Sequence, residues 1–106
     1  MRMAKLKLSI PQPNVARNIS FFGAVFISDA TPSSNIIVTL QQVSGAGNWR
    51  STANAQADVH GVAVASFPSI NLPGIAGGFD NATLLATATG APADSFSSDA
   101  ESVDVV

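Results

Sequence analysis

The chain has 106 residues, no cysteine and a net charge of −2, and only 11% of its residues are charged. This length fits one domain and excludes a second core of useful size. The lack of cysteine excludes disulfides and thiolate metal sites. Val, Ile, Leu and Phe supply 29 residues, which is enough for a folded core. Because 17 alanines, 13 serines and 6 threonines stand where charged residues are usual, the surface suits static contacts better than rapid capture of charged ligands.

Strand patterns dominate from the N-terminus onwards. The segment AKLKLSI at 4–10 alternates apolar and polar residues, which is the pattern of a strand with one buried face. Gly23 is expected at a bulge or a close backbone approach, and Pro68 at a bulge or an edge. Only 51–58 could form a helical turn. Further strands are predicted at 19–28, 36–43, 48–53, 62–70, 82–89 and 101–106. The sequence therefore predicts an all-β fold, a single antiparallel sandwich or barrel of about seven strands.

The stretch DVHG at 58–61 raises the question of an active site, because it holds the only histidine. As a turn, the Asp58 carboxylate would accept a backbone N–H two residues on, and Gly61 would supply the positive φ that rejoins the strand. As a catalytic site, His60 would need a nucleophile and an orienting carboxylate, and the chain has no cysteine and no G-x-S-x-G pattern. We therefore predict a structural turn at Asp58 and Gly61, no catalytic residue and no enzyme activity.

The basic residues are unevenly distributed. Four of the five, Arg2, Lys5, Lys7 and Arg17, lie in the first 17 positions, and the remainder of the chain holds Arg50 against all seven acids. One interpretation is a basic arm that docks on an acidic partner, and the other is a set of lysines on the outer face of an exposed first strand. The expected division is a basic arm or first strand at 1–18 and a body at 19–106, in one domain overall.

Three other features offer binding hypotheses. Trp49 follows a predicted hairpin turn at 44–47 and would either cap the core or stack on a sugar or a partner's surface. Phe79 lies in a glycine-rich loop at 71–81, a second candidate contact region. An acidic stretch would be either a solvated loop or a calcium site, although its spacing lacks a D-x-D pattern, and it contains Asp94, Asp99, Glu101 and Asp104. We predict no metal, no cofactor and, because the body is acidic, no nucleic-acid partner.

The order of these motifs resembles the bacterial and phage immunoglobulin-like domains. The residues that carry the resemblance are IIVTLQQV, STANAQADVHGVAVASF, LPGIAGGFDNATLLATAT and the terminal ESVDVV, and they fall within 19–106. The resemblance implies an immunoglobulin-like sandwich, found either as tandem modules of bacterial surface proteins or as single accessory copies on phage particles. It assigns no binding residues.

The expected function follows from the lack of an export signal. The N-terminal segment has no apolar stretch of the secretory type, and no segment is long and apolar enough to span a membrane. We therefore expect a protein made in the host cytoplasm and located in the virion, with no membrane partner. Its expected role is a head decoration protein that binds and stabilises the assembled shell through the major capsid protein or another virion protein, with self-association on the particle left open. The alternatives are a binding or adhesion module of a bacterial surface or secreted protein, and a phage tail or fibre component.

Overall fold

The computed structural model describes residues 2–106, and this part of the chain forms strands and no helix. The all-β prediction is confirmed, with nine strands in place of about seven. The two additional strands, β2 and β8, are short. In chain order the strands are β1 (Arg2–Ser9), β2 (Asn14–Val15), β3 (Phe21–Ser28), β4 (Asn35–Ser44), β5 (Arg50–Gln56), β6 (Ala63–Ile70), β7 (Asp80–Thr89), β8 (Asp94–Phe96) and β9 (Asp99–Val105).

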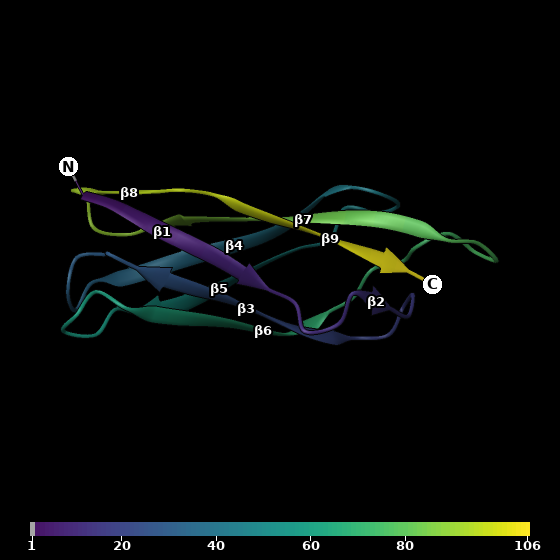
Figure 1. The fold of residues 1–106 in the computed structure, drawn as a ribbon, viewed down its shortest axis with the longest axis horizontal. Helices are drawn as coiled ribbons and strands as arrows, with labels where there is room; N and C mark the ends of the chain where they lie inside the picture. The colour runs from purple at the N-terminus through teal and green to yellow at the C-terminus, as the bar shows by residue number, and fades with distance from the viewer. Residues whose placement is uncertain (1) are drawn as a thin grey trace.

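The strands form two sheets that pack face to face. The first sheet has the order β6-β3-β1-β8 and the second has the order β2-β9-β7-β4-β5. The long strands pair antiparallel, as predicted, whereas β8 runs parallel to β1 and β2 runs parallel to β9. This arrangement is an all-β sandwich of two packed sheets, as the sequence predicts. The molecule measures 47 × 20 × 17 Å, with the long strands directed mainly along its long axis (Figure 1).

The core consists of the inward-facing residues of both sheets. Alternate positions of β1, β3 and β6 face alternate positions of β4, β7 and β9, which is the period-two burial expected of a sandwich. The largest fully buried side chains are aliphatic, and they are Leu8, Ile27, Ile36, Leu40, Ile70, Leu72, Leu84, Val25, Val38 and Val105.

The basic arm expected at 1–18 is part of the sandwich. β1 lies inside the first sheet, between β3 and β8, and β2 extends the second sheet beside β9. Ala4, Leu6 and Leu8 are buried, so β1 cannot be separated from the core that it helps to form. Met1, the first residue of the expected arm, lies outside the described residues.

The second half of β1 is covered by side chains where the chain passes from the first sheet to the second. β8 pairs with β1 only at Arg2–Ala4, and the chain then turns into β9. At the turn, the Leu6 N–H donates to Ser97 Oγ at 3.4 Å and the Leu8 N–H donates to Asp99 Oδ2 at 2.7 Å. These two side chains replace the backbone acceptors of a missing strand, so this edge of the first sheet is sealed.

The bulge predicted at Gly23 is confirmed. The register between β3 and β6 shifts between Phe21 and Gly23, so that Phe21 pairs with Ile70 and Gly23 with Phe67. A Cβ at Gly23 would lie 2.7 Å from Ile70 Cδ1, so the buried Ile70 side chain would have to shift to accept one. Pro68 falls within the irregularity on β6, an edge strand, where a missing N–H costs no ladder hydrogen bond.

The helical turn that 51–58 could form on its sequence is absent, because most of this stretch belongs to β5. Its residues pair with β4 in an unbroken register from Asn35↔Gln56 to Gln41↔Arg50. Alanine has a high helix propensity and a low strand propensity, and pairing with β4 overrides both. The same pairing moves the start of the strand from the expected residue 48 to Arg50, so the hairpin loop includes Trp49.

A buried glutamine organises the loop between β4 and β5. Gln42 is 5% exposed over the whole residue, and among residues 2–106 no other polar residue is buried to this extent. Its Nε2 donates to the carbonyl oxygens of Ala46 at 2.7 Å and Ser44 at 3.2 Å, and its Oε1 accepts from the Trp49 N–H at 3.3 Å. The side chain thus serves as a template around which the loop closes.

Replacing Gln42 by glutamate tests this role. Gln42→Glu keeps the shape but removes the donor to two carbonyl oxygens and places a charge in a buried site. We expect the free energy of unfolding to fall by about 2–3 kcal/mol, measured by urea denaturation. The control is Gln41→Glu, because Gln41 is an exposed neighbour that pairs with Arg50. Equal losses in the two variants would contradict the assignment.

Candidate binding surfaces

The DVHG segment forms a closed turn between β5 and β6. Asp58 Oδ1 accepts the N–H of His60 at 2.8 Å and the N–H of Val62 at 3.0 Å, and the Gly61 N–H donates to the Asp58 carbonyl at 3.1 Å. Gly61 has a φ of +77°, and a Cβ there would collide with the carbonyl oxygen of Ala30. The two backbone donors, Val62 first and then His60, lower the pKa of Asp58. The motif's residues are thus used to build the turn, and His60 is exposed on it.

The turn is joined to the neighbouring β3–β4 loop and to β8. The Ala30 N–H donates to the Gly61 carbonyl at 3.1 Å. Asp94, whose side chain is fully buried, accepts from the Thr31 N–H and the Thr31 hydroxyl, both at 2.8 Å, and lies 3.8 Å from Arg2 Nε. These contacts link the connections at this end of the sandwich into one network.

The four N-terminal basic residues do not form one cluster. Arg2 lies at the end where β1 begins and donates to the Ala30 carbonyl at 3.3 Å, beside Asp94. Arg17 is half-buried, and its Nη1 donates to the Ile75 carbonyl at 2.6 Å. Its backbone N–H donates to the Val106 carbonyl, at the other end of the sandwich. Only Lys5 and Lys7 share a surface, the outer face of β1.

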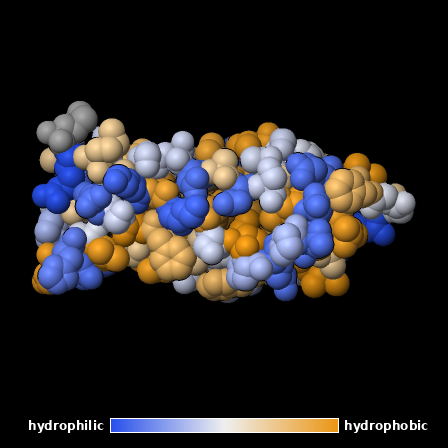
Figure 2. All heavy atoms as spheres, viewed as in Figure 1, coloured by the Kyte–Doolittle hydropathy of each residue, from blue (hydrophilic) through white to orange (hydrophobic). Residues whose placement is uncertain are grey.

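Lys5 and Lys7 border an exposed apolar area on the first sheet. Lys7 pairs with Phe26 of β3, and Phe26 pairs with Val64 of β6, so these three side chains form a row across the sheet. Phe26 and Val64 are each 48% exposed, although both are large apolar residues. We call the outer face of this sheet the basic-apolar face, and it comprises Met3, Lys5, Lys7, Phe22, Phe26 and Val64. Figure 2 shows apolar residues interspersed with polar ones over the side in view.

The second candidate region, Trp49 and Phe79, lies at the end of the sandwich away from the start of β1. Trp49 is half-buried and packs against the core, and it also lines a groove of about 250 Å³ between the edges β5 and β6 together with Phe67 and Pro68. Phe79 is 61% exposed on the glycine-rich 71–79 connection, near the start of β7. Trp49 therefore makes the core contact considered for it and is also accessible at an edge, whereas Phe79 is a surface residue.

Three of the four acidic residues of the C-terminal stretch accept hydrogen bonds from protein donors, in separate places. Asp94 binds Thr31, Asp99 binds the Leu8 amide, and Asp104 Oδ1 accepts from Asn81 Nδ2 at 2.9 Å. Within the described range of 2–106, no three His, Cys, Asp or Glu side chains come together as a metal site requires. Asp94, Asp99 and Asp104 thus make structural contacts within the sandwich.

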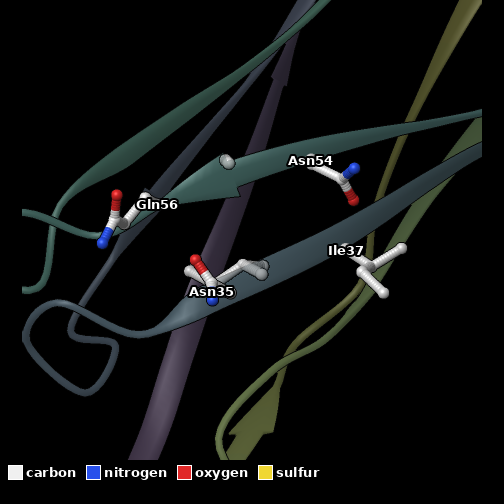
Figure 3. Close-up of a pocket in the computed structure, with 6 residues that line it drawn as sticks. Asn35, Ile37, Asn54 and Gln56 are labelled. Carbon is white, nitrogen blue, oxygen red and sulfur yellow. The ribbon is translucent and has the colours of Figure 1, made fainter.

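A shallow hollow on the outer face of β4 and β5 was not predicted from the sequence. Asn35 and Ile37 of β4 and Asn54 and Gln56 of β5 surround it, with their side chains displayed along the two strands (Figure 3). Asn35 pairs with Gln56, and Ile37 pairs with Asn54. Sequence reasoning missed this hollow because it depends on the pairing of β5 with β4, and its individual residues carry no motif.

No protein-family model matches this sequence, and no curated protein matches it either. No helix in residues 2–106 has the length and apolar character needed to cross a membrane. The resemblance to immunoglobulin-like domains therefore stays a prediction from the sequence, and the structure shows an all-β sandwich.

The lowered pKa of Asp58 predicts a pH dependence of stability. Because the pKa of the folded state lies below that of the unfolded state, the stabilising contribution is complete above the ordinary aspartate pKa and is lost as the pH falls through the folded value. We expect Asp58→Asn, which cannot titrate, to lack this part of the acid-induced loss. Urea midpoints measured between about pH 6 and about pH 2 provide the test.

Asp29→Asn is the control for this experiment, since Asp29 is an exposed aspartate at a φ of +61°, which asparagine also tolerates. The acid-induced loss that depends on Asp58 should remain in this variant, because Asp29 takes no part in the Asp58 hydrogen bonds and its own ion pair, to Lys5 Nζ at 3.9 Å, is exposed at the surface. The same flattening in both variants would show that the Asp58 hydrogen bonds are not its source.

Proposed function

We propose that this chain is a non-enzymatic binding protein that decorates the shell of a phage particle, and that it docks through the basic-apolar face. The observation that carries the proposal is the row formed by Lys7, Phe26 and Val64, with Lys5 beside it. Exposed aromatic and aliphatic side chains bordered by cations favour a partner surface with apolar residues and carboxylates. A ligand that binds only the assembled shell would stabilise it by mass action.

The polar character of the remaining surface supports a single docking side. The outer face of the second sheet carries mainly uncharged side chains, among them Thr39, Thr87 and Thr89, and hydrogen bonds between neighbours, such as Thr83 Oγ1 to Ser102 Oγ at 3.0 Å. This face does expose the aliphatic Ile37, at 51%, but its strands contain none of the aromatic residues that are enriched at the centres of protein interfaces. It suits exposure to solvent.

A second candidate function is a module of a bacterial surface or secreted protein. It is favoured by the positions of the chain ends, since β1 begins at one end of the long axis and β9 finishes toward the other (Figure 1). This geometry suits head-to-tail connection of tandem modules. A tail or fibre component would share the fold and differ in its copy number.

The location of the protein decides between these functions. Nuclease-treated particles, purified by density gradient from the source culture, would be analysed by quantitative mass spectrometry. The proposal expects a copy number comparable to that of the major shell protein. A few copies per particle would indicate a tail or fibre component, and recovery from the cell envelope or medium instead of particles would support the surface module.

Substitutions on the basic-apolar face test the docking side. Lys5→Gln/Lys7→Gln and Phe26→Ser should each weaken binding to particles stripped of the protein by about tenfold or more, because they remove cations and an apolar anchor. Removing β1 would be uninformative, since its inward residues are part of the core. Binding is measured by cosedimentation with particles.

The matched control is Thr87→Glu/Thr89→Glu. These exposed residues lie two apart on the second sheet, as Lys5 and Lys7 do on the first, and the double change lowers the net charge by the same amount. The control should bind like the wild type. Equal weakening by both double variants would mean that net charge, and not the basic-apolar face, determines binding.

A further inference from the structure

The edge of β5 is an unprotected strand edge. β5 ends the second sheet and pairs only with β4. Its seven residues pair without a bulge and contain no proline or lysine, and Arg50 at its start is the only charge. Natural edge strands are usually protected by bulges, prolines or lysines. The neighbouring edge, β6, has this protection, because Pro68 and a register irregularity interrupt it.

The hydrogen bonds that flank the β4–β5 ladder show which backbone groups are free. The Gln42 N–H donates to the Trp49 carbonyl at 2.8 Å, and the Ala57 N–H donates to the Ser34 carbonyl at 2.9 Å. In an antiparallel ladder, hydrogen-bonded pairs alternate with non-bonded pairs. The odd-numbered residues between Trp49 and Ala57 therefore bond to β4, and the N–H and C=O groups that point away belong to Arg50, Thr52, Asn54 and Gln56.

This free edge is complementary to itself. In an antiparallel pair of two β5 strands centred on Ala53, Arg50 lies opposite Gln56 and Thr52 lies opposite Asn54. All four outward-pointing residues on each strand then exchange hydrogen bonds, and the arginines are kept apart. On the inward side, Ser51 faces Ala55 and Ala53 faces its own copy, so only small side chains meet. Shifting the register by two residues would leave part of the edge unpaired.

We propose that two copies of this chain associate through antiparallel pairing of their β5 edges, which joins the two second sheets into one continuous sheet across a twofold axis at Ala53. Such a contact is isologous and closes after two copies. It uses the second sheet and leaves the basic-apolar face on the first sheet free. The proposal therefore does not depend on the proposed docking function.

The test is the oligomeric state of the full chain by sedimentation velocity, at concentrations up to about 1 mM and low ionic strength. We expect a dimer that forms as the concentration rises. Thr52→Lys/Asn54→Lys places lysines opposite each other across the axis and should raise the dissociation constant about tenfold or more. Thr52→Lys/Asn54→Glu is the matched variant, because it places the introduced lysine of each copy opposite the introduced glutamate of the other, and it should associate at least as well as the wild type.

Two further readouts locate the contact. Thr52→Pro removes one edge N–H from each copy without removing a bond to β4, so the folded monomer should persist and the dimer should be lost. Amide hydrogen exchange at Thr52, Asn54 and Gln56 should slow as the concentration rises, whereas exchange at Ala53, which already bonds to β4, should change little.

Several outcomes would overturn the proposal. One is a wild-type protein that stays monomeric at about 1 mM. Another is a dimer that tolerates the double-lysine change, which would place the contact elsewhere. Equal weakening by the double-lysine and lysine–glutamate variants would exclude the register centred on Ala53. Protection of the β5 amides only when an extended peptide from another protein is added would assign the edge to that partner.

Discussion

The hydrogen bond from the Leu8 N–H to the Asp99 carboxylate, at 2.7 Å, holds the C-terminal chain at the point where it passes between the two sheets. Together with Ser97, it seals the edge of β1, which would otherwise be open. The sandwich therefore has one closed side, where β8 and β9 wrap around β1, and one side where β5 and β6 end their sheets. This asymmetry determines which backbone groups remain available to another molecule.

The two proposed surfaces depend on this arrangement in different ways. Because β1 is an interior strand, Lys5 and Lys7 stand on a rigid sheet beside Phe26 and present a fixed pattern, in place of a mobile basic arm. Because β5 is an edge strand, its contribution is backbone hydrogen bonding, which requires no special side chain. One surface therefore offers specificity through side chains, and the other offers self-complementarity through main-chain geometry.

Both ends of the sandwich use polar side chains to fix loops without forming a chemical site. Asp58 and Asp94 hold the turns near the start of β1, and Gln42 closes the β4–β5 loop near the end of the molecule where β9 finishes. Each binds two or more backbone or hydroxyl groups, so its hydrogen-bonding capacity serves the fold. A sequence rich in serine, threonine and alanine thus obtains ordered connections with few charges and no disulfide.

The sequence by itself determined the strands whose residues alternate between core and solvent, such as β1 and β7, and the turn at Asp58 and Gly61, because these depend on interactions between residues close in the chain. It did not determine that 51–58 would pair with β4, since alanines in this stretch favour a helix locally. Nor did it determine that Arg2 and Arg17 would lie at opposite ends, or that Lys7, Phe26 and Val64 would form a row. Those features depend on strand pairing between segments far apart in the sequence. Only the tertiary structure decides this pairing, because the free energy of pairing comes from contacts that no local sequence pattern contains.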